Sequence, residues 1–352
     1  MILFLAKYPE TKEELKDGMI QRIMHIDDYY SERKRAYLDV SYSLKKKKRS
    51  RVINENLQVT ECGFFHLNTI LRHFVKAEFV FIHSVFNVLP VFLFILIFKR
   101  KYTIDLHGVV PEEIIMLNGK MAKLKFTLFN LCERLIFRKA IYGICVTNAM
   151  KKHYAGKFPK SKVKFLVYSI MPNNILGEEP VALDASGNSN IVNVLYSGNT
   201  QAWQNIEMMC ACIKNNLHES YKYYILTGNL SEMESIFSTR GLYPNPKIEI
   251  LSLSPEELKR YYVKAHYGFI LRDDVVVNRV ACPTKMIEYL NYGMIPVVLS
   301  PFVGDFDEMG YEYVKLSDFN AENKPAKSLK NVKIIKNLRD INSKVDIGAI
   351  LY

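Results

Sequence analysis

Positively charged, hydroxyl and carboxylate side chains gather in one segment of the 352-residue chain, RDDVVVNRVACPTKMIEY. Its chemistry-bearing residues are Arg272, Arg279, Thr284, Lys285 and Glu288. Cations beside the amino end of a helix attract phosphate, and a carboxylate one turn later is suited to accept hydrogen bonds from two ribose hydroxyls. The spacing therefore favours a site for a nucleotide diphosphate. The alternative is a solvated surface ion pair between Lys285 and Glu288, which lie three positions apart on a helix.

The elements around this segment predict a βαβ unit. We expect a strand at 267–271, a polar loop at 272–281, a helix at 283–293 and a second strand at 295–299. Pro283 at the first helical position and Gly293 just past the last are usual boundary marks. The loop that leaves the first strand then lies at the carboxyl edge of a parallel sheet, where open α/β sheets bind ligands.

The same alternation of strand and helix runs through both halves of the chain. It predicts two Rossmann-like α/β domains that face each other across a cleft. We place the first at residues 1–169 and the second at 191–316. A stretch rich in Pro, Asn, Gly, Ser and acids, 170–190, is the predicted linker, and 317–352 forms a weakly patterned tail.

Four further residues are candidates for ligand contact. Gly198 and Asn199 follow a predicted strand and precede a helix, which is a second helix start that could face phosphate. Gly18 begins a predicted helix at 18–30 after the first strand. His107 ends a predicted strand at 102–106 and precedes a glycine; a histidine bonded to local backbone is the alternative there.

The segment PTKMIEYLNYGMIPVV resembles the donor-nucleotide segment of GT-B glycosyltransferases, above all glycosyltransferase family 4 and related bacterial polysaccharide enzymes. The resemblance implies that Glu288 binds the ribose of a sugar nucleotide. It also implies that the helix start at Pro283 and Thr284, with Lys285, faces the diphosphate. Many members carry a second glutamate eight positions earlier, where this chain has Val280, so contacts to the donor sugar must come from elsewhere, for example from Asp274 or Asn278.

Two more regions are similar to the family. The pattern D-x-H-G-x-x-P-E-E resembles an acceptor-side loop whose histidine, here His107, faces the transferred sugar. The family's glycine-bearing loop near the donor diphosphate corresponds to Gly18 and also nominates Arg22, and the family's terminal helix packs back on the first domain. The implied function is hexosyl transfer from a nucleotide sugar to a lipid-linked glycan in surface polysaccharide synthesis. Such transfer retains anomeric configuration and needs no metal or other cofactor, with Arg272, Lys285 and His107 as the catalytic candidates.

Charge is divided unevenly between the two halves. Residues 1–169 contain 30 Lys and Arg against 15 Asp and Glu, whereas the remainder contains 18 against 21. Because a general bias toward lysine would affect both halves, the asymmetry indicates an anionic partner for the first domain. The basic runs at 45–51 and 99–101 lack interleaved aromatics and accompany no nucleic-acid motif, so a membrane surface is favoured over nucleic acid. A merely solvated exposed loop is the alternative for 45–51.

The apolar stretch 87–98 is too short to cross a bilayer, which takes about 20 residues. We expect a helix buried between the sheet and a neighbour, or one inserted partly into one leaflet. The start MILFLA reads as a strand and not as a signal peptide. The six cysteines are scattered without C-x-x-C spacing, which favours buried thiols in a reducing cytosol. Together these features predict a cytoplasmic protein, peripheral on the inner face of the cell membrane.

Three alternatives compete with the transferase. A nucleotide-sugar 2-epimerase shares the architecture and would need acid and base carboxylates. A metal-dependent transferase could use Asp305 and Asp307, although acidic residues that begin a short helix are common. The third is a non-enzymatic protein that binds anionic membranes. The patterns do not address the oligomeric state.

Overall fold

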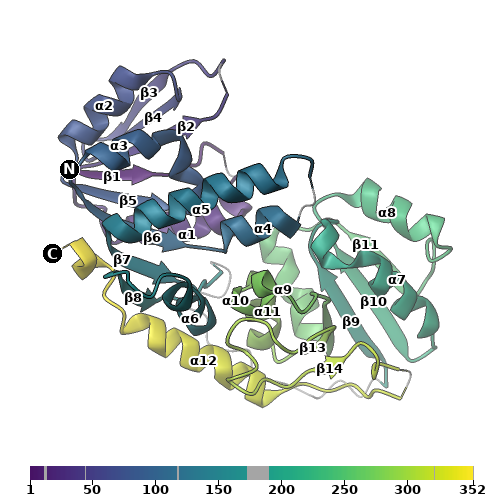
Figure 1. Ribbon diagram of the computed structural model, residues 1–352. Helices are drawn as coiled ribbons and strands as arrows, with labels where there is room; N and C mark the ends of the chain where they lie inside the picture. Colours follow the sequence, from purple (N-terminus) through teal and green to yellow (C-terminus); the bar gives the residue numbers. More distant parts are fainter. Residues whose placement is uncertain (12–13, 44, 117–118, 173–189, 321, 352) are drawn as a thin grey trace. The chain divides into compact units, whose positions relative to one another are not determined.

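The computed structural model describes residues 1–11, 14–43, 45–116, 119–172, 190–320 and 322–351 (Figure 1). They form two compact units. Unit 1 comprises Met1–Ile170 with Ser343–Tyr352, and unit 2 comprises Met171–Asn342. Residues 173–189, most of the predicted linker, lie outside the described part of the chain.

Unit 1 is built on a sheet with the strand order β3-β4-β2-β1-β5-β6-β7-β8. All neighbouring pairs are parallel except β3 with β4. The strands are β1 (Ile2–Leu5), β2 (Arg35–Ser41), β3 (Arg49–Asn54), β4 (Leu57–Gly63), β5 (Phe79–His83), β6 (Lys101–Leu106), β7 (Ala140–Cys145) and β8 (Lys164–Val167). Apolar runs such as ILFL in β1 are buried throughout, as expected for parallel strands covered on both faces.

The helices of unit 1 follow the strands in the usual alternation. They are α1 (Gly18–Asp28), α2 (Leu67–Lys76), α3 (Phe92–Ile97), α4 (Val110–Met116), α5 (Ala122–Lys139) and α6 (Asn148–Lys157). Short 3-10 turns occupy Glu14–Lys16, Val85–Asn87, Leu89–Val91 and Gly348–Leu351. Local chemistry sets the ends: Thr147 caps α6 by accepting a hydrogen bond from the Met150 amide at 3.0 Å.

Unit 2 holds a wholly parallel sheet with the order β11-β10-β9-β12-β13-β14. Its strands are β9 (Val192–Ser197), β10 (Tyr221–Leu226), β11 (Ile248–Leu251), β12 (Tyr267–Ile270), β13 (Ile295–Val298) and β14 (Val314–Lys315). Its helices are α7 (Ile206–Asn215), α8 (Leu230–Thr239), α9 (Pro255–Lys264), α10 (Val276–Val280), α11 (Thr284–Asn291) and α12 (Leu329–Ser343), with a 3-10 turn at Ala202–Gln204. A capping box between Ser254 and Glu257 begins α9.

The strand order of unit 2 reverses between β9 and β12, which is the doubly wound order in which the first strand is central. Unit 1 has the same arrangement around β1 and β5, extended at one edge by β8 and at the other by the antiparallel β3. Ligands of such sheets bind outside the carboxyl ends of the strands at the reversal. In both units, therefore, the loops at that edge are where a site is expected.

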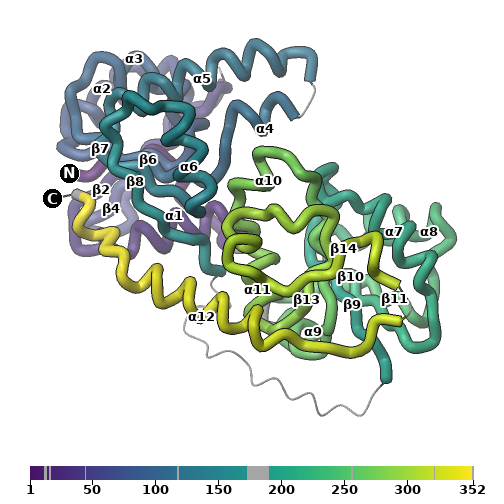
Figure 2. Tube along the Cα trace, turned by 60° about the horizontal axis from the view of Figure 1, so that its bottom comes forward, coloured from purple at the N-terminus to yellow at the C-terminus, as the bar shows by residue number. Residues whose placement is uncertain are grey.

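Each unit has its own hydrophobic core. The last residues of the chain enter the core of unit 1, where Ile347 and Ile350 are buried and the Tyr30 hydroxyl donates to the Ile347 carbonyl. The two termini accordingly lie near each other in the trace (Figure 2). Residues 317–342, which the sequence assigns to a separate tail, belong to unit 2 and include most of α12.

Several local expectations are wrong in detail. Part of the basic run 45–51 forms β3 instead of a loop, because the strand pairs with β4. The stretch 87–98 makes two 3-10 turns and only a short helix, α3. The loop at 272–281 contains α10. All six cysteines are buried free thiols, as predicted. Within the described residues, each helix is too short or too polar to cross a bilayer.

Candidate functional site

The candidate site of unit 2 lies at the carboxyl ends of β9 and β12, where the strand order reverses. Ser197 ends β9 and leads into Gly198 and Asn199, and Arg272 follows shortly after β12. The amino end of α11 adjoins both loops, because Lys285 in its first turn reaches Tyr196 of β9. Tertiary structure thus brings together segments that are some 75 to 90 positions apart in the sequence.

Lys285 is packed against aromatic and polar groups. Its Nζ atom lies 4.6 Å from the centre of the Tyr196 ring and donates to Gln204 Oε1 at 3.1 Å. A Cβ atom at position 198 would lie 1.8 Å from this Nζ, so Gly198 leaves the space that the ammonium occupies. Burial, with repulsion from Arg272, lowers the pKa of Lys285 to about 7, although Glu288 acts in the opposite direction.

Arg272 is the second cation of the site. Its Nη1 atom donates to the buried Asn278 side chain at 3.1 Å, and Asn278 in turn donates to the Asp273 carbonyl at 2.9 Å. Asn278 therefore holds the guanidinium in place without neutralising it. In the described part of the chain, neither Arg272 nor Lys285 takes part in an ion pair. Two nearby cations without a carboxylate partner form a site that favours an anion.

Glu288 lies one turn further along α11. Its Oε2 atom accepts a hydrogen bond from the Tyr262 hydroxyl at 3.1 Å, and that hydroxyl is also 3.1 Å from Ser197 Oγ. The adjacent Tyr289 accepts a hydrogen bond from the Ser197 amide at 2.9 Å. Two tyrosine hydroxyls therefore fix α11 to the end of β9: that of Tyr262 contacts both Glu288 and Ser197, and that of Tyr289 binds the Ser197 amide.

A glycine in the neighbouring strand allows this close packing. A Cβ atom at Gly268 of β12 would lie 2.4 Å from the Tyr289 ring. The ring consequently rests directly on the strand, and α11 sits close to the sheet. Pro283, which is buried, caps the helix without a side-chain hydrogen bond, and Gly293 beyond its end has a φ of 66°.

Other residues predicted for this site are placed differently. Arg279 is exposed and pairs with Asp274, with its Nε atom 2.6 Å from Oδ1, so both charges are already compensated. The Gly198 amide donates to the Leu226 carbonyl at 2.8 Å and is not available to phosphate. Asn199 is exposed, and its carbonyl accepts from the Tyr196 hydroxyl. Thr284, partly exposed at the first position of α11, stays a candidate.

Gly18 begins α1, as predicted, but the helix start is occupied by a carboxylate. Asp17 caps α1, and its Oδ1 atom accepts hydrogen bonds from the Met19 and Ile20 amides at 2.8 and 3.1 Å. An acid already bonded to these amides opposes a phosphate group at the same place. The predicted contact of Gly18 with a diphosphate therefore gains no support from its surroundings.

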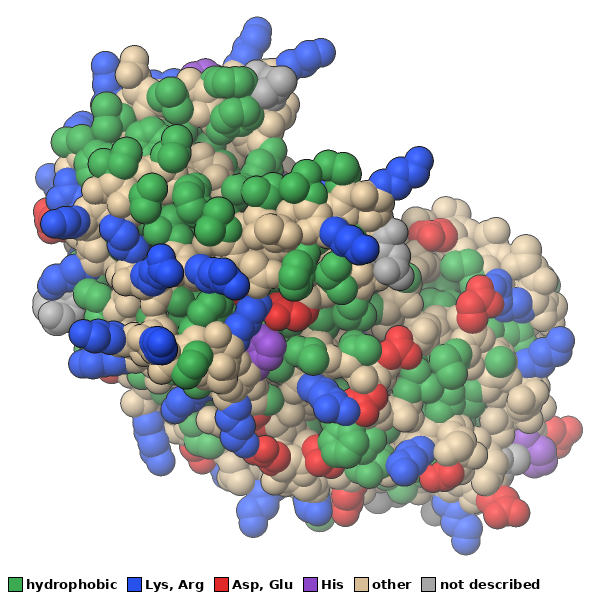
Figure 3. Space-filling view, in the orientation of Figure 1, with side chains coloured by type: hydrophobic (Ala, Val, Ile, Leu, Met, Phe, Trp, Pro, Cys, Tyr) green, Lys and Arg blue, Asp and Glu red, His purple; other side chains and the backbone are tan. Residues whose placement is uncertain are grey.

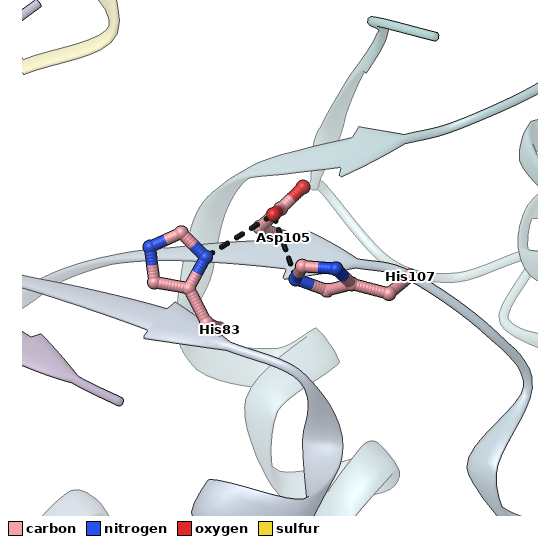
Figure 4. A group of neighbouring side chains, drawn as sticks. All are labelled: His83, Asp105 and His107. Atoms are coloured by element: carbon pink, nitrogen blue, oxygen red, sulfur yellow. Dashed lines mark hydrogen bonds and ion pairs between the residues drawn. The ribbon is translucent and has the colours of Figure 1, made fainter. Parts of the chain in front are cut away.

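The carboxyl edge of unit 1 carries a buried cluster of charged and imidazole groups (Figure 4). Asp105 of β6 is fully buried and lies 2.8 Å from His107 Nε2 and 3.2 Å from His83 Nδ1. Arg22 of α1 donates to both Asp105 oxygens at 2.7 to 3.0 Å and to the Tyr168 carbonyl at 2.9 Å. Burial acts to raise the pKa of Asp105, but Arg22 and the two histidines hold it well below its usual range.

His107, His83 and Asp105 form the one group of at least three potential metal ligands within the described residues. Their surroundings do not suit a cation, because the Asp105 oxygens already accept from Arg22, whose fixed charge would repel a metal ion. The contact of His107 is with a carboxylate, not with local backbone. Only a small part of the His107 side chain, 12%, is exposed.

The two acids after His107 have separate roles. Glu112 lies 3.5 Å from His153 Nε2 and 2.8 Å from Lys157 Nζ, and these two partners, against the effect of burial, lower its pKa to about 2. Glu113 accepts a hydrogen bond from the Val109 amide at 3.0 Å and lies where a Cβ atom on Gly108 would be. Both acids therefore stabilise the loop and the start of α4.

Sequence reasoning missed several residues of these two sites. Arg22, which the family resemblance nominates near the diphosphate, pairs with Asp105 instead. The residues that were missed are Tyr262, Ser197 and Gln204, which surround Glu288 and Lys285, and His83, which contacts Asp105. None carries a local motif. Only the position of each at or near the end of a predicted strand or helix was a signal.

Comparison with known proteins supports the fold. No family model and no curated protein matches the chain. Among solved structures, sucrose-phosphate synthase from Thermosynechococcus elongatus matches with a TM-score of 0.60 at 11% identity, covering 99% of this chain and 92% of its own. WaaG, a glycosyltransferase involved in lipopolysaccharide biosynthesis, matches with a TM-score of 0.62 at 10% identity, covering 100% and 97%.

The chain has the GT-B fold. A third match of this kind is HepE from Anabaena in complex with UDP-glucose, with a TM-score of 0.57 at 12% identity over 99% of this chain and 92% of HepE. The prediction of two Rossmann-like domains is confirmed, and the matches extend over the whole chain. In this GT-B chain, the second domain contains the site formed by Lys285, Arg272 and Glu288, and the first domain contains the Asp105 cluster.

Asp305 and Asp307, which the metal-dependent alternative would use, do not form a comparable site. Asp305 is buried and Asp307 is exposed, in a turn between β13 and β14. The two side chains lie in different environments, as acids at a turn commonly do. They belong to no group of three or more potential metal ligands in the described residues.

Proposed function

We propose that the protein is a glycosyltransferase that takes its sugar from a nucleotide-sugar donor bound in unit 2. The observation that carries the proposal is the pair of cations Lys285 and Arg272, both without an ion-pair partner in the described residues, at the carboxyl edge of the sheet beside Glu288. A diphosphate would supply the missing negative charge. Glu288 would accept hydrogen bonds from the ribose.

The reaction would break the bond between the anomeric carbon and the diphosphate oxygen, whose electron pair stays on the diphosphate. A new bond forms from the anomeric carbon to the oxygen of an acceptor hydroxyl, whose proton passes to the departing diphosphate. Because negative charge grows on the departing phosphate, Lys285, Arg272 and the amino end of α11 would stabilise the transition state electrostatically. We propose that the configuration is retained and that His107 contacts the transferred sugar.

Donor binding is the first test. UDP-glucose is the first probe because HepE was solved with it, followed by GDP- and dTDP-sugars. A ligand that binds only the folded state raises the melting temperature, so one of these donors should stabilise the wild type and leave a Lys285→Met variant unchanged. No shift with any donor, or an equal shift in both proteins, would remove the site from consideration.

A labelled donor then separates transfer from 2-epimerisation. A transferase consumes the donor faster when a lipid-linked glycan acceptor is added and releases the nucleoside diphosphate. An epimerase converts the donor without acceptor and without release. The first outcome supports the proposal, and the second replaces it.

We propose that transfer is independent of metal. The support is that the ammonium form of Lys285 and Arg272 would supply the positive charge that a metal would otherwise bring to a diphosphate, and that Arg22 already compensates Asp105. Turnover should therefore persist after treatment with a chelator. Turnover that is abolished by chelation and restored by Mg²⁺ or Mn²⁺ would argue for the metal-dependent alternative.

The acceptor side of the proposal rests on an exposed apolar face of unit 1. Helix α3 contacts both α2 and α5, and all three present apolar side chains to solvent (Figure 3). This apolar face consists of Leu67, Leu71, Val75, Leu93, Leu96, Ile97, Leu124, Leu128 and Leu131. Leu93 and Ile97 are 64% and 71% exposed. An apolar surface of this kind usually marks an interaction site.

Charges around the apolar face favour a bilayer as its partner. Exposed cations interleave or border it, on α2, on α5 and in the segment just after α3: Arg72, Lys76, Lys99, Lys101, Lys123, Lys125, Arg134 and Arg138. Acyl chains would cover the leucines while anionic headgroups meet the cations. The run 45–51 contributes less than expected, because Lys46 pairs with Glu61 and Arg49 with Glu10. We propose peripheral attachment to the cytoplasmic leaflet, where a lipid-linked acceptor would be presented.

Flotation with vesicles tests the attachment. The wild type should bind vesicles that contain phosphatidylglycerol and bind neutral phosphatidylcholine vesicles weakly. Raising salt from ~0.1 M to ~1 M shortens the Debye length from ~10 Å to ~3 Å, so the fraction that stays bound reports insertion of the apolar face. Leu93→Asp with Ile97→Asp should abolish that fraction. Val52→Asp is the matched control, because Val52 of β3 is 73% exposed but lies outside the face.

A further inference from the structure

A basic pocket lies at the edge of the unit 1 sheet opposite to His107. Its lining residues directly precede or begin the strands β1, β2, β5, β6 and β7. The cavity has a volume of about 910 Å³, and seven of its eleven lining residues are Lys or Arg. The cations come from 33–34, 99–101 and 138–139. Glu78 is the one acid among them, and it pairs with the Met1 amino group at 3.0 Å.

The positive charge of this pocket is held in place but not neutralised. Arg100 donates to the Phe74 and Val75 carbonyls at 3.2 and 3.0 Å, and Lys139 donates to the Leu96 carbonyl at 3.0 Å. Carbonyl oxygens orient a cation without removing its charge. Lys34, Lys99, Arg100, Lys101, Arg138 and Lys139 take part in no ion pair within the described residues. A concave surface of one charge concentrates oppositely charged ligands.

The same hydrogen bonds show that the pocket adjoins the apolar face. Val75 and Leu96, whose carbonyls anchor Arg100 and Lys139, are themselves members of that face. Lys99 follows the exposed Ile97 by two positions. A ligand that fits both surfaces is amphiphilic, with phosphate in the pocket and acyl chains along α3. A free phosphate compound would use the cations and leave the leucines uncovered.

We propose that this pocket is a headgroup site for an anionic phospholipid of the bilayer, distinct from the donor site in unit 2. The proposal rests on the membrane attachment proposed above and adds to it a defined place where one headgroup binds. With so many cations and a volume of this size, the pocket suits a headgroup with two phosphates better than one with a single phosphate. Vesicles with cardiolipin should therefore bind more tightly than vesicles with phosphatidylglycerol at equal total charge.

The test compares two variants that each lose two positive charges, one variant inside the pocket and the other outside it. The pocket variant is Lys34→Gln with Arg138→Gln, and the control is Lys45→Gln with Lys47→Gln; all four residues are exposed and belong to unit 1. Because their side chains are exposed, both variants should keep the wild-type melting temperature. Both should also keep the donor-induced thermal shift, since unit 2 is unchanged. Binding to cardiolipin vesicles is then measured by flotation over a range of lipid concentrations.

We expect the pocket variant to bind cardiolipin vesicles at least tenfold more weakly than the control, and to lose the preference for cardiolipin over phosphatidylglycerol. Equal losses in the two variants would overturn the headgroup site while leaving general electrostatic attachment intact. Failure of the wild type to bind any vesicle would overturn both. Inorganic pyrophosphate is the soluble probe: wild-type protein that binds it, but not vesicles, would show a site for free phosphates and overturn the lipid assignment.

Discussion

Asp105 and Arg22 form a buried ion pair in unit 1, in which the two side chains expose 0% and 2% of their surface. The guanidinium meets both carboxylate oxygens and links α1 to β6, while the same carboxylate faces His107 and His83. Three groups, Arg22, His83 and His107, thus depend on one negative charge. Removing one partner should therefore cost more stability than it would in an exposed ion pair, because a charge left alone in the interior is costly.

Asp105→Asn should destabilise the fold by about 3–5 kcal/mol, since it leaves Arg22 buried without a counterion. Urea unfolding followed by circular dichroism measures the change. Replacing both partners, Arg22→Met with Asp105→Leu, removes the lone charge and should recover part of the loss. A double variant as unstable as the sum of the two single variants would show that the ion pair itself is not the cause.

His107→Ala should reduce turnover more than donor affinity. The histidine belongs to unit 1, whereas the cations proposed to hold the diphosphate belong to unit 2. If His107 contacts the sugar on approach to the transition state, kcat and kcat/KM fall together and the donor dissociation constant stays close to that of the wild type. Unchanged turnover with a lower melting temperature would instead assign His107 to the Asp105 cluster alone.

Donor affinity should fall as pH rises through 7, because of Lys285. The pKa of its ammonium in the free protein is lowered to about 7, so the side chain is charged below that pH and neutral above it. The diphosphate of UDP-glucose keeps a constant charge in this range. If only the ammonium form binds, the dissociation constant increases by up to about tenfold per pH unit above 7. Titration calorimetry between pH 6 and 9 measures it.

The matched variant for this pH series is Lys285→Arg, whose charge persists at every pH tested. Its affinity should vary little between pH 6 and 9, whatever its absolute value. A wild-type profile as flat as that of the variant would mean that Lys285 does not bind the diphosphate.

Glu288→Gln should weaken donor binding by about 1.5–3 kcal/mol, or roughly 10- to 150-fold. The amide has a similar size but accepts weaker hydrogen bonds than a carboxylate. Tyr262→Phe is the comparison, because it removes the 3.1 Å hydrogen bond to Glu288 and keeps the charge. A loss in Tyr262→Phe as large as in Glu288→Gln would indicate that Glu288 acts by holding α11 and not by contacting ribose.

Gly198→Ala should weaken donor binding and also lower stability, because Gly198 has a φ of 159°, which L side chains rarely adopt. The new methyl group would lie 1.8 Å from Lys285 Nζ and would push this flexible ammonium away from Tyr196 and Gln204. We expect an affinity close to that of Lys285→Met in the same assay. Gly228→Ala is the control, because nothing lies within 4 Å of the position its methyl group would take. Wild-type affinity in Gly198→Ala would show that the observed place of the ammonium does not matter for binding.

Local patterns in the sequence were sufficient to place the elements that carry the donor site. Pro283 and Gly293 mark α11, the apolar runs around it form β12 and β13, and the capping box of Ser254 begins α9. These signals work because they depend on backbone geometry and burial within a few neighbouring residues. The two-domain α/β class follows from the same alternation repeated along the chain.

Local patterns were not sufficient where long-range pairing decides the structure. The run 45–51 is basic and reads as a loop, but β4 offers its edge and so part of the run becomes β3. The apolar residues of α3 read as core, yet Leu93 and Ile97 are exposed, because α3 packs on α2 and α5 through its other face, where Ile95 is buried. Propensity is a weak guide when a neighbouring element supplies hydrogen bonds or leaves a face uncovered.

The candidate sites show the same division at the level of single side chains. The sequence by itself determined that Lys285 and Glu288 share one turn of α11, since helical spacing is a local property. Only the tertiary structure decided that Tyr262, 26 positions away, donates to Glu288, and that Gly198 makes room for Lys285. It likewise joined Arg22 to Asp105 across 83 positions. Such contacts arise because strands that are distant in the sequence end at the same edge of a sheet. The periodicity of the sequence does not predict which loops face each other at that edge.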